Sequence, residues 1–337
     1  MKTDDLKKAF DKIAASGNIA ILTHVDADGD ALGTAYGLKL VIEQMGAATG
    51  APKAVRVITE EIEPHKLMPV VCDSETDGEN NTDYDLVIAV DSSDLGRLGT
   101  RAELYLAAGE NTICFDHHKT CTRFGAINYV DVEAGACGEV IYEFCRLYGV
   151  EITPEIANNL YLAISSDTGG FRQANATPRS LEIAADLIRK GANSAKINTL
   201  LFVSNTIERT RLVGEVLCGL KFSKNTGVSL ITVSPEQMSK HNCTSSDIEG
   251  LVNFARNILG VKIAIYLRKK DDGSIKASLR SNSDIYDVSE FCARFGGGGH
   301  LRAAGCEFPT ETDLQAVGEI IVREAEDYIR SRDYLSK

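Results

Sequence analysis

The chain has 337 residues, a length that exceeds one typical hydrophobic core, so we expect two domains. Apolar residues make up 44% and charged residues 25% of the sequence, which excludes a disordered or a fibrous chain. The formal net charge of −12 argues against a protein that tracks long nucleic acid, which usually shows a basic face, and favours small substrates.

We expect a cytoplasmic protein with no contact to a membrane. No uninterrupted apolar stretch of about 18 residues occurs, so no membrane-spanning helix is expected, and the first residues lack the apolar region of a secretory signal. The nine cysteines form no C-x-x-C pair, and most lie within apolar runs. This pattern is typical of buried free thiols in a reducing compartment.

The first half of the chain alternates short apolar runs with helical patterns. A first helix ends at Gly17, and a second, Asp30–Met45, is expected to be capped by Gly46. Thr153-Pro154 and Thr177-Pro178 each place a capping hydroxyl before a proline, which predicts two helix starts. The predicted strands of this half are residues 19–23, 54–59, 86–90 and 112–115. Strands that alternate with helices indicate an α/β fold with a mainly parallel sheet.

The pattern changes after Gly191 and predicts a smaller α/β domain with a mixed sheet. Its predicted strands are residues 228–233, 261–267 and 274–280, and Asp272-Gly273 supplies a hairpin turn between the last two. A glycine run and a final amphipathic helix follow. We therefore expect a metal-binding catalytic domain at residues 1–195, a linker at 196–205 and a substrate-binding domain at 206–337.

Four clusters of acidic and histidine residues occur in the first half, and three of them directly follow predicted strands. The clusters are His24-Val-Asp26-Ala-Asp28-Gly-Asp30, Asp91-Ser-Ser-Asp94, Asp116-His117-His118 and Ser166-Asp167-Thr168-Gly169-Gly170. The carboxyl ends of parallel strands form the ligand crevice of an open α/β sheet, so these clusters are expected to converge. An aspartate after a strand is more often a turn residue or a helix cap, so the joint pattern carries the argument.

Imidazole and carboxylate ligands together suit Mn²⁺, with Mg²⁺ or Fe²⁺ as alternatives. The clusters contain no cysteine, which speaks against structural zinc. Two ions roughly 3.5–4 Å apart can activate a water and neutralise phosphoryl oxygens. A bridging ligand is needed for such a pair, and Asp91, alone at a strand end, is the candidate.

These motifs resemble those of the DHH phosphoesterase superfamily. Asp116-His117-His118 resembles its name-giving triplet, and the other matching segments are HVDADGDALG, DSSDLGRLG, SSDTGGF and the C-terminal GGGGHLRAAG. Ala27 stands where the family usually has proline, which removes no ligand. The resemblance covers nearly the whole chain and is strongest to the bifunctional oligoribonuclease and 3′-phosphoadenosine-5′-phosphate (pAp) phosphatase subgroup.

The resemblance implies roles for single residues. His24, Asp28 and Asp91 would hold one metal ion, and Asp30, Asp91, His117 and Asp167 would hold the other. His118 would act on the scissile phosphate as a proton donor or phosphate contact. Asp116 would orient a neighbouring histidine.

The second domain is expected to bind the far end of the substrate. Taken alone, Arg280 is an ordinary surface charge and the glycine run an ordinary flexible loop whose amides can contact anions. The resemblance implies that Arg280 grips a terminal phosphate and His300 contacts the nucleotide. The residues expected to bind substrate are Arg280, Ser281, Gly297, Gly298, Gly299, His300 and, following a metal motif of the first domain, Arg97. Arg172 also follows a metal motif and ranks below the ligands.

The resemblance thus implies a manganese-dependent phosphoesterase that hydrolyses very short oligoribonucleotides to mononucleotides and pAp to AMP. A stand-alone phosphodiesterase for cyclic di-AMP or linear dinucleotides is the nearest alternative. An inorganic pyrophosphatase is disfavoured by the GGGGH loop, a RecJ-like exonuclease by the short length, and a non-catalytic nucleotide sensor by the full set of expected ligands. A homodimer is compatible with the sequence.

Overall fold

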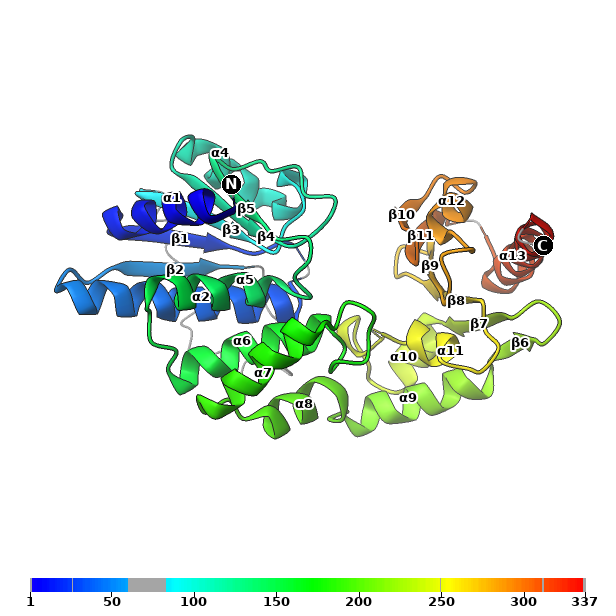
Figure 1. Cartoon of the computed structure of the whole chain (residues 1–337). Helices are drawn as coiled ribbons and strands as arrows, with labels where there is room; N and C mark the ends of the chain where they lie inside the picture. Colours follow the sequence, from blue (N-terminus) through cyan, green and yellow to red (C-terminus); the bar gives the residue numbers. More distant parts are fainter. Residues whose placement is uncertain (1, 26, 60–82, 249, 311, 336–337) are drawn as a thin grey trace. The chain divides into compact units, whose positions relative to one another are not determined.

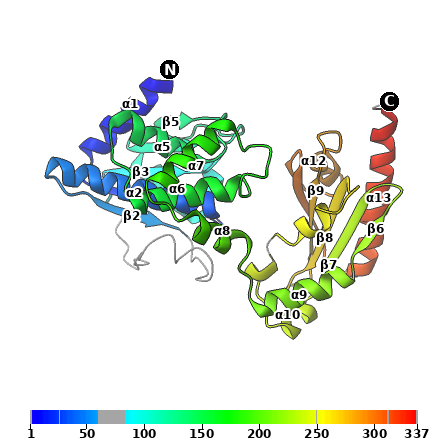
Figure 2. The same cartoon turned by 60° about the horizontal axis from the view of Figure 1, so that its bottom comes forward.

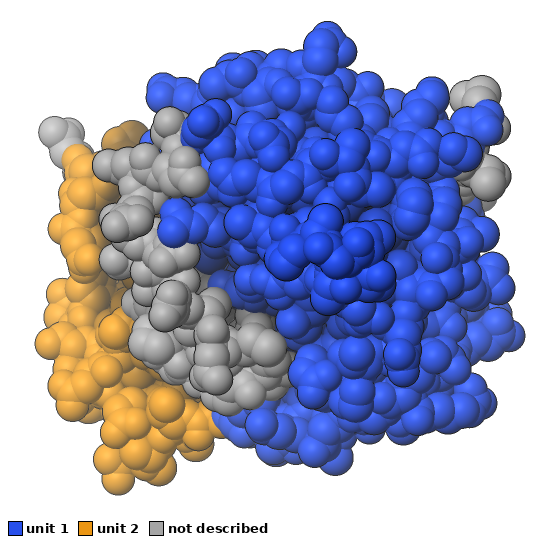
Figure 3. All heavy atoms as spheres, turned by 90° about the vertical axis from the view of Figure 1, so that its left-hand side faces the viewer, with its two compact units in different colours: residues 1–204 blue, residues 205–337 orange. Residues whose placement is uncertain are grey.

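The computed structural model describes residues 2–25, 27–59, 83–248, 250–310 and 312–335. The chain divides into two compact units, residues 1–204 and residues 205–337, which Figure 3 shows in blue and orange. The predicted linker, residues 196–205, contains most of a helix that belongs to the first unit. None of the helices in the described segments is both long and apolar enough to cross a membrane.

Unit 1 is built on a parallel sheet whose strand order is β2-β1-β3-β4-β5. Its elements, all but η1 labelled in Figure 1, are α1 (Lys2–Ala15), β1 (Asn18–Leu22), α2 (Gly29–Thr49), β2 (Ala54–Ile58), β3 (Leu86–Val90), the 3-10 helix η1 (Leu95–Arg101), α4 (Ala102–Ala108), β4 (Thr112–Asp116), β5 (Ile127–Val130), α5 (Cys137–Tyr148), α6 (Pro154–Asp167), α7 (Pro178–Arg189) and α8 (Ser194–Phe202). The strand order reverses between β1 and β3, where an open α/β sheet leaves a crevice.

Both faces of this sheet are buried, which explains why its strands read as continuous apolar runs. Ile21 and Ile88 face a core that includes side chains of α1, α2, α5, α6 and α7. Ala20 and Val87, which directly precede Ile21 and Ile88, face a smaller core on the other side of the sheet, with α4 and its flanking segments. The alternation follows from the two-residue period of a strand.

The helix starts in unit 1 follow the predicted capping chemistry. Thr153 and Thr177 each accept a hydrogen bond from a backbone amide in the first turn, and proline follows each of them. The predicted end of α2 at Gly46 is wrong, because the helix continues to Thr49. Gly46 is buried where a Cβ atom would lie 2.8 Å from the Ala51 carbonyl, and Gly50, with φ of 70°, caps the helix instead.

Unit 2 contains a six-stranded mixed sheet in the order β10-β11-β9-β8-β7-β6, in which β7 and β8 pair in parallel and the other neighbours antiparallel. Figure 2 labels its strands β6 to β9. Its elements are α9 (Ile207–Cys218), β6 (Lys221–Ser223), β7 (Val228–Val233), α10 (Pro235–Lys240), the 3-10 helix η2 (Ser246–Ile248), α11 (Val252–Arg256), β8 (Ile263–Lys269), β9 (Ile275–Ser281), α12 (Val288–Ala293), β10 (Gly298–His300), β11 (Ala303–Phe308) and α13 (Leu314–Leu335). The predicted α/β fold class, with a parallel sheet followed by a mixed one, is confirmed.

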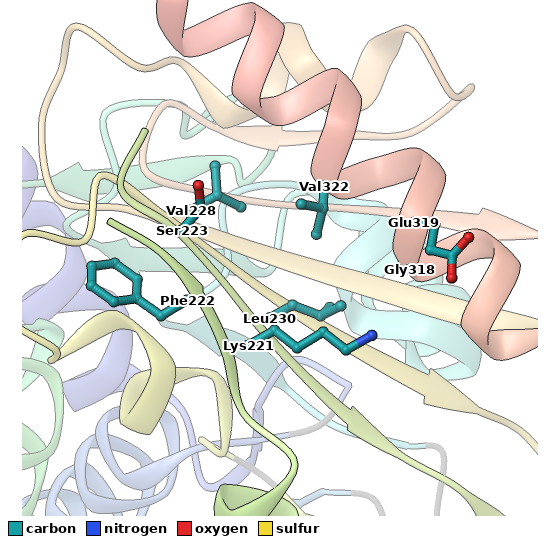
Figure 4. Close-up of a pocket in the computed structure, with 8 residues that line it drawn as sticks. All are labelled: Lys221, Phe222, Ser223, Val228, Leu230, Gly318, Glu319 and Val322. Carbon is teal, nitrogen blue, oxygen red and sulfur yellow. The ribbon is translucent and has the colours of Figure 1, made fainter. Parts of the chain in front are cut away.

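The two faces of the second sheet are covered by different helices. Side chains of α12 and α13 pack on the face that carries Ile265 and Leu279. Side chains of α9 and α11 pack on the face that carries Ala264 and Tyr266. A hollow of about 240 Å³ lies between β6, β7 and α13, and Figure 4 shows Phe222, Leu230 and Val322 among its mostly apolar lining.

Candidate active site

Three neighbouring strands of unit 1 deliver acidic and histidine side chains to one edge of the sheet. His24 follows β1, Asp91 follows β3, and β4 ends at Asp116, directly before His117. Because β1, β3 and β4 are adjacent and parallel, their carboxyl ends meet at the reversal of strand order. The predicted convergence of these segments is what the structure shows.

The side chains form three overlapping groups of possible metal ligands. The groups are His24, Asp28 and Asp91, then Asp30, His117 and Asp167, and then Asp91, His117 and His118, and within each group one ligand atom per residue lies within 4.8 Å of the others. Asp91 also reaches the second group, because its Oδ1 lies 3.4 Å from His117 Nε2, while its Oδ2 lies 3.8 Å from His24 Nε2. These two distances are longer than the donor–acceptor distance of an ordinary hydrogen bond, and they suit atoms that bind the same cation.

His24 and His117 are held in the same way. His24 Nδ1 lies 2.6 Å from the Val25 carbonyl oxygen, and His117 Nδ1 lies 3.2 Å from that of Ala134. A carbonyl can only accept, so each Nδ1 carries a hydrogen and each Nε2 is available to a cation. Metal-binding histidines are commonly oriented by such a bond from the other ring nitrogen.

Asp30 is positioned by two helices. Its side chain is almost fully buried and accepts hydrogen bonds from Thr34 Oγ1 (3.0 Å) and from the amides of Cys137 (2.7 Å) and Gly138 (3.1 Å). These amides belong to the first turn of α5, where the helix dipole favours a negative charge. Asp28 caps α2 by accepting from the amides of Asp30 and Ala31 through Oδ1 only, so its second oxygen is available to a cation.

Asp91 has a strained backbone conformation, and its buried side chain lies close to other acidic groups. Its φ of 53° lies in the left-handed region, which aspartate tolerates better than most residues. Its Oδ1 is buried, and no described residue places a hydrogen bond on it. Burial raises the pKa of Asp91, and burial together with Asp91 raises the pKa of Asp30. A buried acceptor among several carboxylates fits a bound cation.

The charges around His117 favour a cation at the same place. Burial opposes a charge on this ring, but its contacts with Asp91, Asp30 and Asp167 outweigh burial and raise its pKa to about 11. Asp167 ends α6, and burial raises its pKa to about 6. The cluster therefore attracts a positive charge to its centre, and either a proton or a metal ion can supply that charge. The residues that surround the centre are Asp30, Asp91, His117 and Asp167.

His118 differs from His24 and His117 in its partner. Its Nδ1 lies 2.7 Å from Asp116 Oδ1, so it donates to a carboxylate instead of a carbonyl. This hydrogen bond raises the pKa of His118, and although burial opposes ionisation of Asp116, the same bond lowers the pKa of Asp116. The His118 side chain is 34% exposed, so its Nε2 can act as a proton donor at the edge of the cluster.

Two arginines lie beside the cluster. Arg97 is exposed, and its Nη2 lies 3.3 Å from His24 Nδ1. Arg172 donates from Nε to the Gly169 carbonyl oxygen (2.7 Å), and its guanidinium lies over the Phe202 ring, 5.0 Å from the centroid. Both arginines lie within a few residues of candidate metal ligands. Because His24 Nδ1 already donates to Val25, it accepts no hydrogen bond from Arg97, and the Arg97 guanidinium can contact a phosphate.

Sequence reasoning missed Asn175, eight residues beyond Asp167. Its Nδ2 donates to Asp167 Oδ2 (3.1 Å), to the Asp167 carbonyl oxygen (3.2 Å) and to the Gly135 carbonyl oxygen (2.9 Å). Asn175 therefore ties Asp167 to the loop before α5. An asparagine in an irregular loop carries no motif, so only the folded structure identifies it.

The predicted substrate-binding residues of unit 2 do not all lie together. Arg280 pairs with Ala303, and Ala303 pairs with His300, so both predicted contacts share one face of the sheet. Ser281 is buried on the other face, and its hydroxyl donates to the Ser283 carbonyl oxygen (2.6 Å). The structure thus separates the Ser281 side chain from Arg280.

Taken alone, the glycine run reads as a plain flexible loop in the sequence. In the structure, part of it forms a strand. Gly298–His300 form the edge strand β10. A Cβ atom on Gly297 would lie 2.2 Å from the Gly305 carbonyl oxygen, and one on Gly299 would lie 2.6 Å from that of Ala303. These glycines permit close approach of β10 to β11, so the run has a packing role that explains its composition.

The fold and the cluster together define the class of protein. The model described as "DHH family, N-terminal domain" matches residues 18–164, and that of the DHHA1 domain matches residues 225–329. The chain belongs to the DHH family, as its motifs predicted.

Relatives with known names match over most of both chains. The chain is 30% identical to the bifunctional oligoribonuclease and PAP phosphatase NrnA of Thermus thermophilus, over 96% of this chain and 93% of that protein. It is 26% identical to the protein of the same name from Bacillus subtilis, over 90% and 92%. A crystal structure of an exopolyphosphatase-related protein from Bacteroides fragilis superimposes with a TM-score of 0.85 at 25% identity, covering 98% of each chain.

Proposed function

We propose that the chain is a two-metal phosphoesterase that hydrolyses very short oligoribonucleotides to mononucleotides and pAp to AMP. The observation that carries this proposal is the pair of ligand groups that meet at Asp91, which belongs to the group with His24 and Asp28 and lies 3.4 Å from His117 of the group with Asp30 and Asp167. The names of the relatives from Thermus thermophilus and Bacillus subtilis support the substrate class.

The donor atoms indicate how the ions would be held. His24, Asp28 and Asp91 would bind one ion, and Asp30, His117 and Asp167, again with Asp91, would bind the other. Imidazole and carboxylate donors without thiolate suit Mn²⁺, with Mg²⁺ or Fe²⁺ as alternatives. Two such ions would supply a bound water of lowered pKa and would neutralise the phosphoryl oxygens of the substrate.

The protein residues supply orientation and a proton. His118, whose pKa is raised by its hydrogen bond with Asp116, would donate a proton to the leaving oxygen or bind the scissile phosphate. Arg97 would neutralise a phosphate oxygen beside His24. Arg280 and His300, on one face of the second sheet, would bind the part of the substrate that is not cleaved.

A substrate panel with Mn²⁺-loaded protein tests the proposal. We expect phosphate release from pAp and mononucleotides from the 5′-phosphorylated dinucleotide pApA, with little cleavage of a 24-nucleotide RNA. Faster hydrolysis of cyclic di-AMP than of pAp or pApA would favour the cyclic dinucleotide alternative. Release of phosphate from pyrophosphate alone would contradict the proposal.

A further inference from the structure

The two proposed ion sites are held by different parts of the chain. Site 1 comprises His24, Asp28 and Asp91, and site 2 comprises Asp30, Asp91, His117 and Asp167. At site 1, the Val25 carbonyl oxygen orients His24, and amides in the first turn of α2 orient Asp28. The side chains that belong to site 2 alone are held by other backbone groups.

The β5–α5 segment, residues 131–138, provides these backbone groups. One of its carbonyl oxygens accepts a hydrogen bond from His117 (3.2 Å), and another accepts from Asn175 (2.9 Å), which in turn donates to Asp167 (3.1 Å). Two of its amides donate to Asp30 (2.7 and 3.1 Å). A shift of this one segment would therefore move three of the four site 2 ligands.

Glu139, the residue that follows the segment in α5, fixes the position of the segment. The Glu139 side chain is fully buried, and its Oε1 accepts hydrogen bonds from the Gly135 amide (3.2 Å) and from Ser180 Oγ (2.6 Å). Gly135 is also the residue whose carbonyl oxygen accepts from Asn175. Ser180 belongs to the capping box of α7. Glu139 thus links the middle of the segment to the start of a second helix.

The packing around Gly135 leaves little room for movement. A Cβ atom at this position would lie 2.7 Å from the Asn175 carbonyl oxygen, 2.8 Å from Ser180 Oγ and 3.0 Å from Glu139 Oε1. Contacts this short exclude any side chain larger than hydrogen. The segment, α7 and the loop of Asn175 therefore meet at Gly135, and a change at Glu139 is transmitted to that loop.

Arg179 connects the two ends of the segment. Its Nη1 lies 2.7 Å from Asp131 Oδ2, and its Nε lies 3.5 Å from Glu139 Oε2. Burial raises the pKa of Glu139, and its hydrogen bonds and the Arg179 charge offset only part of this rise. Packing of α5 and α7 does not require such a costly group, because Val140 and Ile183 already place both helices in one apolar core. The buried carboxylate therefore fits a role in the position of the segment.

We infer that Glu139 is a positioning residue, which acts through Gly135 to hold the site 2 ligands at distances that suit a cation. Without its carboxylate, the Gly135 amide loses its acceptor, and the β5–α5 segment can shift. Groups that orient metal ligands in this way contribute roughly 10- to 100-fold in affinity. Site 1 keeps its own supports, so its affinity should not change. The inference rests on the proposed function, because it concerns the ions that the proposed reaction uses.

The test is a Mn²⁺ titration of the full chain that does not depend on hydrolysis. Electron paramagnetic resonance of the free ion gives the affinity of each binding step. The test variants are Glu139→Ala, which removes the acceptor, and Glu139→Gln, which keeps an acceptor oxygen for Gly135. Val140→Ala is the control for stability, because Val140 is the next residue of α5 and is fully buried in the apolar core. Glu143→Ala is the control for charge, because Glu143 lies one turn further along α5 and 4.0 Å from Arg179.

We expect Glu139→Ala to weaken one binding step roughly 10- to 100-fold and to leave the other unchanged. Glu139→Gln should recover most of the lost affinity. Val140→Ala should lower the Tm but keep both affinities, and Glu143→Ala should also keep both. The double variant Asp28→Asn/Glu139→Ala should weaken both steps, because Asp28 belongs to site 1. If Glu139→Ala does not fold, Glu139→Asp takes its place, since the shorter side chain withdraws the carboxylate from Gly135 and keeps the charge.

Equal affinities for both ions in the wild type and in Glu139→Ala would overturn the inference. An equal loss of affinity in Val140→Ala would also overturn it, because Glu139 would then act through stability alone. The proposed function fails by a different result. If Glu139→Ala weakens one of two Mn²⁺ sites but the Mn²⁺-loaded wild type cleaves neither pAp nor pApA, the positioning role stands and the phosphoesterase assignment is rejected.

Discussion

Replacing Asp91 with asparagine should change the stability of the protein in opposite directions with and without divalent ions. Asparagine keeps the size of the side chain and tolerates the φ of 53° at this position, so the backbone is not strained further. The substitution removes one negative charge from a cluster in which burial raises the pKa values of Asp91 and Asp30.

In EDTA, Asp91→Asn should be more stable than the wild type, because the amide removes one of several neighbouring acidic groups from a buried position. A buried polar group without a hydrogen bond costs about 1–3 kcal/mol, and more when it is charged, so removal of the charge should give a gain of about that size. For a unit of 204 residues this corresponds to a rise in Tm of roughly 2–12 °C.

With Mn²⁺ at 100 times its Kd, the order should reverse. Each occupied site adds about 2.7 kcal/mol, so two sites raise the Tm of the wild type by roughly 10–20 °C. Asp91→Asn should lose most of this rise, because both ligand groups include or contact Asp91.

Differential scanning calorimetry over a series of Mn²⁺ concentrations measures both effects. Asp11→Asn is the control, because Asp11 is an exposed residue of α1 whose charge lies at the surface beside Lys7. The reasoning is refuted if Asp91→Asn is the less stable protein in EDTA, or if Mn²⁺ raises its Tm as much as that of the wild type.

Three further outcomes are expected. His118→Asn should lower kcat for pAp by roughly 10²- to 10⁴-fold with the number of bound Mn²⁺ ions unchanged, and a lost ion would instead make His118 a ligand. Asn175→Ala should weaken Mn²⁺ affinity by roughly 10- to 100-fold while activity recovers at saturating Mn²⁺, and an unchanged titration of activity with Mn²⁺ would reject its role in holding Asp167. Hydrogen bonds from Lys240 and His241 lower the pKa of Glu215 to about 2, so its contribution to stability is present above its usual pKa of 4.5 and is lost as the pH falls towards 2. The difference in Tm between the wild type and Glu215→Gln should therefore shrink over that interval, and a constant difference would show that the charge of Glu215 does not matter.

The parts of the fold that the sequence predicts are those that depend on local chemistry. Strands β3 and β7 have the predicted bounds because their apolar runs are buried on both faces. The Thr-Pro helix starts are also as predicted, because a cap depends only on the adjacent residues.

The missed strands depend on distant partners. β11 has the sequence AAGCEF, with no β-branched residue, and its extended form follows from pairing with β9 on one side and β10 on the other. Glycine identity alone also does not distinguish a helix cap from a close contact, which is why Gly46 rather than Gly50 was predicted to end α2.

In the candidate site, too, residues that depend on local sequence could be predicted and residues that depend on distant partners could not. The acidic and histidine residues at strand ends could be predicted, because parallel strands end at one edge of a sheet. The residues that hold them could not. Asn175 beside Asp167 and the α5 amides beside Asp30 are brought together only by the folded chain.

The number of Mn²⁺ ions bound per chain tests the central claim most directly. Elemental analysis after equilibrium dialysis at saturating Mn²⁺ should give two ions per wild-type chain and at most one for Asp91→Asn. Fewer than one ion in the wild type, or two ions in both proteins, would contradict a cluster in which Asp91 joins two cation sites.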